Sequence, residues 1–172
     1  MSDLFAFTLR PFRIEDCKSI AYHANNRLIW QNLRDRFPFP YTEMDAIQFI
    51  QIVMRGNPIT EFAIDINGNA VGAAGIVLKD DIYLGNGEIG YWLGGEYWGK
   101  GLGTKVVQEL TRKAFEEFHL YRVYAEVFEN NIASIRVLEK NGFTREASLK
   151  NSIIKDGIYQ TLNIFSRRNP EH

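Results

Sequence analysis

The sequence has a single cysteine, Cys17, among its 172 residues, so no disulfide can form within the chain. Its three histidines, His23, His119 and His172, lie far apart and outside any zinc-binding spacing, so we predict no metal site. No apolar run approaches the length of a membrane span, and the N-terminal residues lack the basic start and apolar core of a secretion signal. These absences favour a cytoplasmic protein in a reducing compartment, with no membrane partner.

The chain also carries little net charge. Its 20 basic and 21 acidic residues give a formal net charge of −1 at pH 7. Such a balance provides no overall field for collecting nucleic acid, so we predict no nucleic-acid partner, and any phosphate group must be held by a local site. Hydrophobic residues make up 45% of a chain long enough for one sizeable core, which predicts a single domain over residues 1–172.

Apolar periodicity and turn signals divide the chain into short strands and helices. Asn67-Gly68 predicts a tight hairpin turn, and Thr42 with Asp45 three residues later predicts a capped helix start. Pro11 is expected to interrupt the first strand. The predicted strands cover residues 4–9, 62–66, 70–78, 88–93 and 123–127, with two more joined near 155–157; the predicted helices cover 15–25, 27–34, 103–118 and 132–140, with another between Thr42 and Gly56.

A strand, a glycine-rich turn, a helix and a second strand follow one another between residues 88 and 127. This order is a βαβ unit, whose two strands should be parallel. The hairpins elsewhere should pair antiparallel strands. We therefore predict an α+β fold with a mixed, mostly antiparallel central sheet flanked by helices.

The glycine-rich turn contains Gly99, Gly101 and Gly103, followed by the helix predicted for residues 103–118. Backbone N–H groups at the start of a helix bind phosphate oxygens, and glycines leave room for the approach. Lys100 and Thr104 would add a charge and a hydroxyl group. The alternative interpretation is that the glycines only permit a tight turn between a strand and a helix.

Two common phosphate-binding motifs fit this segment poorly. Residues 94–101 nearly match the nucleotide-triphosphate loop, but Gly101 stands where that loop needs a serine or threonine for magnesium. The dinucleotide motif needs G-x-G-x-x-G directly after a first strand, whereas these glycines alternate and lie late in the chain. Nucleotide hydrolysis and dinucleotide binding are therefore disfavoured.

Three segments carry a resemblance to a known family: Glu-Ile-Gly-Tyr-Trp-Leu at 88–93, Trp-Gly-Lys-Gly-Leu-Gly-Thr at 98–104, and Asn-Ile-Ala-Ser at 131–134 followed by Val-Leu-Glu-Lys-Asn-Gly-Phe at 137–143. With Leu-Arg-Pro-Phe at 9–12, they are similar to the GNAT acetyltransferase superfamily, particularly its RimJ/RimL-type branch, across nearly the whole chain. Trp98 occupies a position where the strict signature has arginine or glutamine, and the branch often has tryptophan there. The resemblance implies the GNAT fold, whose parallel strand pair splays apart at the acetyl-coenzyme A site.

The resemblance also implies roles for individual residues. Glu88 would be the catalytic base, directly or through water, and Ser134 would donate a proton to the leaving thiolate; the alternatives are a strand-end carboxylate and a helix cap. The implied contacts with the co-substrate acetyl-coenzyme A are Leu93, Trp98, Gly99, Lys100, Gly101, Leu102, Gly103, Thr104 and Asn131. The implied acceptor contacts are Trp30, Arg34, Phe39 and Tyr41, whose aromatic rings would alternatively pack onto the core.

We therefore expect an N-acetyltransferase that uses acetyl-coenzyme A and direct attack by a primary amine, with a protein N-terminal α-amine as the acceptor. The alternatives are a small-molecule amine, such as a polyamine, an aminoglycoside or an amino-acid-like amine, and a non-catalytic acyl-coenzyme A-binding module. Cys17 lies far in sequence from the glycine-rich turn, which argues against a covalent acyl-enzyme. The sequence does not decide between a monomer and a homodimer.

Overall fold

The computed structural model describes residues 6–171. The chain divides into two compact units: unit 1 comprises Met1–Gly75 and Tyr91–Val106, and unit 2 comprises Ile76–Gly90 and Val107–His172. Strands β3 (Asn69–Leu78) and β4 (Asn86–Leu93) each have residues in both units. The prediction of a single domain stays a prediction.

Among residues 6–171, seven strands form one mixed sheet in the order β1-β2-β3-β4-β5-β7-β6, which confirms the predicted α+β architecture. The other strands are β1 (Thr8–Pro11), β2 (Glu61–Ile66), β5 (Arg122–Phe128), β6 (Thr144–Lys155) and β7 (Ile158–Arg168). The helices are α1 (Cys17–Ala24), α2 (Arg27–Trp30), α3 (Glu43–Val53), α4 (Leu102–Arg112) and α5 (Ile132–Lys140), with short 3-10 turns at Ile14–Asp16, Asp81–Tyr83 and Gly95–Tyr97 and a π-helical turn at Lys113–Glu117.

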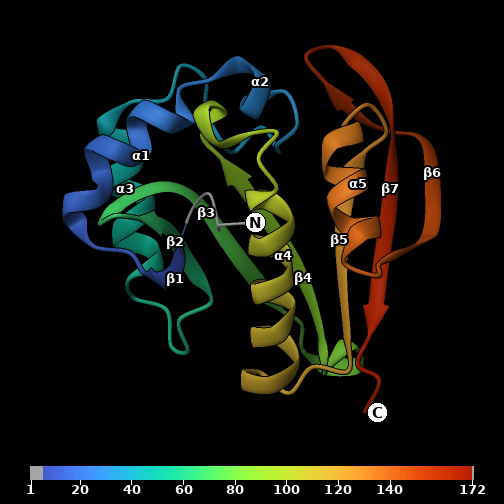
Figure 1. Cartoon of the computed structure of the whole chain (residues 1–172). Coiled ribbons are helices and arrows are strands. Elements are labelled where there is room, and N and C mark those ends of the chain that lie inside the picture. Colours follow the sequence, from blue (N-terminus) through green and yellow to red (C-terminus); the bar gives the residue numbers. More distant parts are fainter. Residues whose placement is uncertain (1–5, 172) are drawn as a thin grey trace. The chain divides into compact units, whose positions relative to one another are not determined.

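In unit 1, helices α1 and α3 pack against the antiparallel strands β1, β2 and β3 (Figure 1). Buried side chains from both helices, including Ile20 and Ile50, meet the small residues Ala63 and Ala73 of the strands. Small side chains on the strands allow the helices to approach the sheet closely. Trp92 at the end of β4 also packs against this cluster.

Two local predictions in unit 1 are confirmed. Thr42 and Asp45 form a capping box at the start of α3: the Asp45 N–H donates to Thr42 Oγ1 at 3.2 Å, and the Thr42 N–H donates to Asp45 Oδ2 at 2.8 Å. The β2–β3 turn has φ values of 53° at Asn67 and 86° at Gly68. This left-handed pair is the backbone that asparagine and glycine favour in a two-residue hairpin.

In unit 2, the first residues of β4 run parallel to β5, with Glu88 opposite Tyr124, which confirms the parallel pair predicted for the βαβ unit. Strand β7 then pairs antiparallel with β5 on one side and with β6 on the other. The β6–β7 hairpin turns at Asp156 and Gly157, as predicted (Figure 1). Helix α5 covers the predicted residues and ends at a left-handed Gly142, with φ of 76°.

Four predicted boundaries are wrong. Pro11 does not interrupt the first strand but is its last residue and pairs with Phe62; β1 is an edge strand, where a missing N–H is tolerated. Residues 4–5 of that predicted strand lie outside the described residues. The helix predicted for 27–34 ends at Trp30, the helix expected to close at Gly56 ends at Val53, and the helix predicted for 103–118 changes to a π-helical turn at Lys113.

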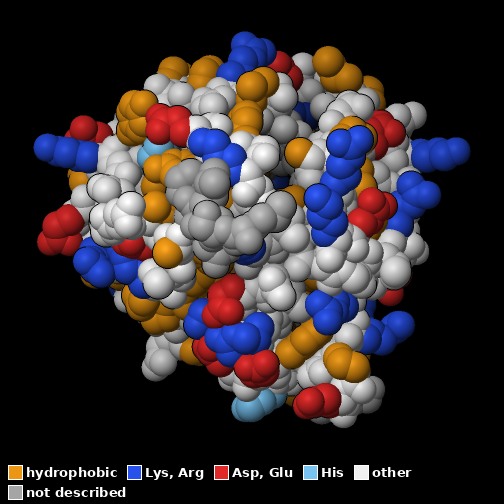
Figure 2. All heavy atoms as spheres, viewed as in Figure 1, with side chains coloured by type: hydrophobic (Ala, Val, Ile, Leu, Met, Phe, Trp, Pro, Cys, Tyr) orange, Lys and Arg blue, Asp and Glu red, His pale blue; other side chains and the backbone are white. Residues whose placement is uncertain are grey.

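Basic and acidic side chains are interspersed on the face shown in Figure 2, as a net charge of −1 leads one to expect. Between residues 6 and 171, no helix combines the length and the apolar character needed to cross a membrane.

Candidate functional site

The glycine-rich turn follows the end of β4 in unit 1. The Gly94 N–H donates to the Val71 carbonyl at 2.8 Å, which holds the strand end, and the 3-10 turn Gly95–Tyr97 comes next. Gly99 and Gly101 have φ values of 70° and 78°, and a Cβ atom at either position would have no neighbour within 4 Å. The left-handed backbone explains why glycine is needed. An approaching anion would require the open space beside this backbone. The glycines can therefore both permit a tight turn and leave room for a phosphate group.

Two side chains of the turn hold its own backbone. The indole N–H of Trp98 donates to the Leu93 carbonyl at 2.8 Å, so it links the turn to the strand end. Lys100 Nζ donates to the Glu96 carbonyl at 2.7 Å. Both side chains therefore shape the turn from which α4 begins at Leu102, a buried residue.

Helix α1 contacts the same turn through His23, which the sequence did not single out. The His23 ring lies 5.0 Å from Tyr22 and 5.7 Å from Tyr97, centroid to centroid. A Cβ atom at Gly94 would lie 2.4 Å from His23 Nδ1, so glycine is needed at this position for the close approach. Burial lowers the pKa of His23, although the charge of Glu96 opposes this effect. The histidine is therefore a neutral packing residue at neutral pH.

The predicted acceptor residues of unit 1 differ in burial: Phe39 is exposed, Trp30 is half-buried and Tyr41 is buried. Trp30 and Phe39 lie 5.9 Å apart, centroid to centroid, and Phe39 is 40% exposed. Tyr41 is buried and stacks on Phe37, with 4.7 Å between the centroids. Burial raises the pKa of Tyr41 to about 12. Tyr41 therefore belongs to the core, whereas the exposed ring of Phe39 and the half-buried ring of Trp30 are the part of this region that is available to a ligand.

Arg34 is exposed on the segment between α2 and α3. Glu61, at the start of β2 in the same unit, was not predicted as a site residue. It pairs with Gly75 on β3, and a Cβ atom at Gly75 would lie 2.1 Å from a Glu61 carboxylate oxygen. Burial raises the pKa of Glu61 to about 7, while the charge of Arg36 partly opposes the rise. No local sequence signal identifies this carboxylate, because its environment comes from another strand.

In unit 2, Glu88 is held by an ion pair that the sequence did not predict. Lys79 Nζ donates to Glu88 Oε2 at 3.0 Å, and the two side chains are only 27% and 15% exposed. The Lys79 ammonium also lies 5.6 Å from the ring centroid of Tyr124. Burial lowers the pKa of Lys79, but its hydrogen bonds to Glu88 and Tyr124 outweigh burial and raise that pKa. Lys79 therefore remains charged at neutral pH and fixes the Glu88 carboxylate.

Asn131 and Ser134 are also placed in unit 2. Asn131 is the N-cap of α5, and its side-chain oxygen accepts the Ser134 backbone N–H at 3.2 Å. The cap of this helix is therefore Asn131, and the half-buried Ser134 hydroxyl is not needed for that role. Of the predicted residues, those from Leu93 to Thr104 and the four acceptor residues lie in unit 1, whereas Glu88, Asn131 and Ser134 lie in unit 2.

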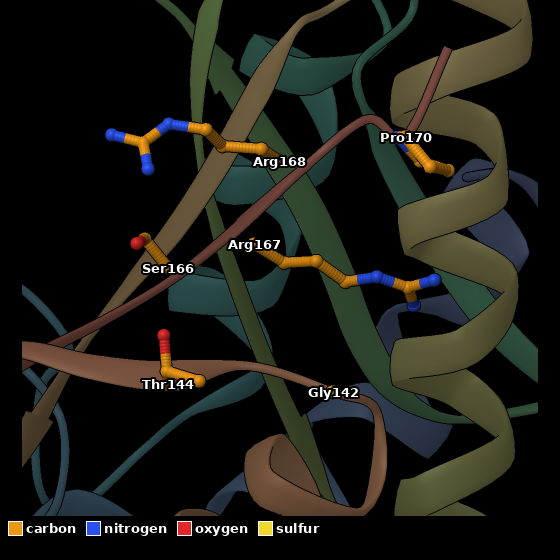
Figure 3. A pocket seen from close by; sticks show the side chains of 6 residues that line it. All are labelled: Gly142, Thr144, Ser166, Arg167, Arg168 and Pro170. Atoms are coloured by element: carbon orange, nitrogen blue, oxygen red, sulfur yellow. The ribbon is translucent and has the colours of Figure 1, made fainter. Parts of the chain in front are cut away.

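Unit 2 also has an open hollow of about 310 Å³ near the end of β7 (Figure 3). It is lined by Gly142, Thr144, Ser166, Arg167, Arg168 and Pro170, none of which is a predicted site residue. Arg167 and Arg168 point in opposite directions (Figure 3), and Arg167 Nη1 donates to the Asn141 carbonyl at 2.9 Å. The guanidinium groups of Arg167 and Arg168 therefore do not converge on a common point in the hollow. Among residues 6–171, no group of three or more His, Cys, Asp or Glu is arranged to hold a metal ion.

Sequence comparisons place these observations among known proteins. Residues 6–144 match the model of the acetyltransferase (GNAT) domain. "Probable N-acetyltransferase YjcK" of Bacillus subtilis strain 168 is 35% identical over 83 residues, which cover 48% of this chain and 46% of the relative. "Uncharacterized N-acetyltransferase p20" of Bacillus licheniformis is 28% identical over 149 residues, which cover 83% of this chain and 82% of the relative. The match thus spans about half the length of YjcK and most of p20.

Solved structures share the fold. Mycobacterium smegmatis RimJ, in complex with CoA-disulfide, has a TM-score of 0.85 at 21% identity, with 96% of this chain and 83% of that chain covered. RimL, a ribosomal L7/L12 alpha-N-protein acetyltransferase in complex with coenzyme A, has a TM-score of 0.83 at 20% identity, with 94% and 93% covered. At such identities the likeness concerns the fold, and it confirms the predicted GNAT fold.

Proposed function

The chain belongs to the GNAT acetyltransferase family, and we propose that it moves an acetyl group from acetyl-coenzyme A to a primary amine, with a protein N-terminal α-amine as the acceptor. Relatives named N-acetyltransferases, aligned over most of the chain, support this type of reaction. The identity of the acceptor is a more specific proposal than the type of reaction.

The observation that carries the proposal is the backbone of the glycine-rich turn. Gly99 and Gly101 both have positive φ, and the space beside them is open. Helix α4 follows directly with eleven residues, so its N-terminal N–H groups and its dipole can stabilise an anion. These features fit the pyrophosphate of coenzyme A, which Lys100 and Thr104 would also approach. The main chain at Leu93 would bind the pantetheine arm.

The reaction needs two proton movements besides attack on the thioester. The amine nitrogen attacks the carbonyl carbon, and the carbon–sulfur bond then breaks to release a thiolate. We assign Glu88 as the base that takes a proton from the attacking nitrogen, and Ser134 as the donor to the thiolate. The ion pair with Lys79 supports the first role, because it fixes the Glu88 carboxylate in one position. The cap formed by Asn131 supports the second, because it leaves the cap role to another residue.

An N-terminal α-amine suits this arrangement chemically. Its reference pKa of about 7.7–8.0 means that a substantial fraction is neutral near neutral pH, so only a modest base is needed. The exposed ring of Phe39 and the half-buried ring of Trp30 offer an apolar surface beside which the first residues of a peptide would lie. RimL, whose fold this chain shares, is described as an alpha-N-protein acetyltransferase.

The first test is the shift in melting temperature with acetyl-coenzyme A, free coenzyme A, ATP with magnesium, and NADH, because a ligand that binds the folded state raises its stability. A rise with only the two coenzyme A compounds supports the proposed site. A rise in melting temperature with ATP or NADH would contradict the proposed site, and so would the absence of a rise with all four ligands.

The second test is thiol release from acetyl-coenzyme A with peptides bearing a free α-amine, with spermidine and with an aminoglycoside. Glu88→Gln should lower kcat by about 10²-fold or more while the affinity for acetyl-coenzyme A is retained. Glu139→Gln, an exposed carboxylate on α5, is the matched control. If the protein acetylates spermidine or the aminoglycoside but no peptide, the acceptor is a small-molecule amine and not a protein N-terminus. Binding without turnover of any amine would indicate an acyl-coenzyme A-binding module.

A further inference from the structure

The β3–β4 loop, residues 79–85 of unit 2, presents large apolar side chains to solvent. Three consecutive residues, Ile82, Tyr83 and Leu84, have exposed fractions of 80%, 62% and 73%. Monomeric proteins seldom expose such clusters, and where they occur they mark sites of interaction with another molecule. This loop is therefore a candidate contact surface.

Hydrogen bonds hold the β3–β4 loop in one conformation. The Tyr83 N–H donates to the Asp80 carbonyl at 3.0 Å, and the Leu84 N–H donates to the next carbonyl, at 3.1 Å. The side-chain amide of Asn86 donates to the Tyr83 carbonyl at 2.9 Å. Because the backbone of the loop is already ordered, little entropy needs to be lost when its side chains are covered.

Two exposed carboxylates stand beside these apolar side chains. Neither Asp80 nor Asp81 has a hydrogen bond or an ion pair from its side chain among residues 6–171. Lys79, the basic residue of the loop, is already paired with Glu88. A molecule that covers the loop must therefore offer a cation beside an apolar surface, because a carboxylate that is buried without a partner is costly.

Tyr121 connects this loop to the hollow of Figure 3. The Tyr121 N–H donates to the Gly85 carbonyl at 2.9 Å, and the Asn169 N–H donates to the Tyr121 carbonyl at 2.8 Å. Asn169 stands between Arg168 and Pro170, which both line the hollow. The Tyr121 side chain is 41% exposed. An acidic, apolar loop and a basic hollow are thus neighbours within unit 2, with Tyr121 between them (Figure 1).

The hollow suits a carboxylate. Its volume of about 310 Å³ leaves room for an aspartate side chain. The Arg168 guanidinium is exposed and has no hydrogen bond or ion pair among residues 6–171; its charge helps to lower the pKa of Glu146, which is itself paired with Arg122. Four of the six lining residues have polar side chains: Thr144, Ser166, Arg167 and Arg168.

We propose that the β3–β4 loop and the hollow form a self-complementary dimer interface. With a two-fold axis near Tyr121, Asp80 of one copy pairs with Arg168 of the other, and the same contact occurs a second time by symmetry. Ile82 and Leu84 of both copies are covered near the axis, and the charged pairs lie around them, as in other protein interfaces. This inference does not depend on the proposed acetyl transfer.

A second copy of the chain fits this surface better than other occupants do. Asp80 and Asp81 would repel an anionic membrane surface or a nucleic acid. A dimer in which the two loops faced each other directly would place like charges together, which is also unfavourable. Pairing of each loop with the hollow of the other copy joins opposite charges and covers the apolar side chains at the same time.

Sedimentation velocity at a series of protein concentrations measures the dimer, which should be reversible in wild type. Asp80→Arg and Arg168→Glu should each raise the dimer Kd by about 10²-fold, because each places like charges together at both symmetric contacts. Asp80 has an extended backbone and its side chain makes no cap hydrogen bond, so arginine fits there. Leu84→Ser should raise Kd at least about tenfold. Ile154→Ser, at a 56% exposed position of β6, is the matched control and should leave Kd unchanged.

An exchange of charges makes the test specific to this contact. A mixture of the Asp80→Arg and Arg168→Glu proteins should form heterodimers with a Kd close to that of wild type, because each contact again joins opposite charges. The double variant should form homodimers for the same reason, and this recovery also shows that the single variants are folded. A wild type that stays monomeric at all concentrations, or a dimer whose Kd none of the three loop and hollow variants changes, would overturn the proposal. Failure of both the mixture and the double variant to associate would do the same.

Discussion

Replacing Glu61 with glutamine should stabilise the protein at pH 8 and leave its stability nearly unchanged at pH 4.5. Burial raises the pKa of Glu61 from the ordinary 4.5 to about 7, and the charge of Arg36 offsets only part of this effect. The folded state therefore binds the carboxyl proton more tightly than the unfolded state does. The stability from this proton is fully present below about pH 4.5 and is lost as the pH rises to about 7. Glutamine resembles the protonated form and cannot ionise.

The magnitude follows from the two pKa values. They differ by about 2.5, and a difference of one corresponds to ~1.4 kcal/mol. Glu61→Gln should therefore raise the free energy of unfolding by up to about 3 kcal/mol above pH 7. For a chain of 172 residues, this corresponds to an increase in Tm of about 6–12 °C.

Urea denaturation at pH 4.5, 6 and 8 measures this effect in wild type, Glu61→Gln and Glu43→Gln. The difference between wild type and Glu61→Gln should grow with pH and level off above pH 7. Glu43 is exposed in the first turn of α3, so its replacement should change the free energy of unfolding by only about 0.3–1 kcal/mol. A difference for Glu61→Gln that is the same at all three pH values would refute the reasoning.

Three further predictions concern other contacts. Arg10→Met, which removes the partner of buried Asp16, should lower the free energy of unfolding at pH 7 by about 3–5 kcal/mol, and this loss should shrink in urea titrations at pH 3, where the carboxylate becomes protonated. Thr42→Ala should cost about 1 kcal/mol in thermal unfolding, with Thr42→Ser close to wild type. Lys79→Met should lower kcat about tenfold, equivalent to ~1.4 kcal/mol, without changing the KM for acetyl-coenzyme A; Lys79→Arg should restore the rate if the cation positions Glu88.

Local signals in the sequence predicted local structure well. The capping box of Thr42 and Asp45 and the Asn67-Gly68 turn depend on neighbouring residues only, so the sequence contains all the information that they need. The boundary at Pro11 failed because proline is tolerated where a strand lies at a sheet edge, and edge position depends on the whole strand order. Helix α2 ends early, and Asn32 Nδ2 donates to the Leu28 carbonyl, a side-chain contact that competes with helix continuation.

The candidate site was predictable where a short motif specifies it. The positive φ values of Gly99 and Gly101 agree with what a glycine-rich turn before a helix requires. The ion pair of Lys79 with Glu88 and the packing of Glu61 on Gly75 were not predictable, because each joins residues of two strands whose register is fixed only in the folded chain. Motifs thus located the turn, and strand pairing determined the surroundings of the carboxylates.

Strand β2 carries two carboxylates that the protein treats differently. Asp65 accepts a hydrogen bond from Arg10 Nε at 2.6 Å, and the same guanidinium donates to Asp16 at 2.7 and 2.8 Å. Burial alone would raise the pKa of Asp16, but its hydrogen bonds to Arg10 and to the Arg13 backbone outweigh burial and lower that pKa. Glu61 lies four residues before Asp65 and has no such ion pair within residues 6–171. Burial instead raises the pKa of Glu61, so replacing Glu61 with glutamine should raise the free energy of unfolding at pH 8, whereas removal of the Arg10 guanidinium should lower it.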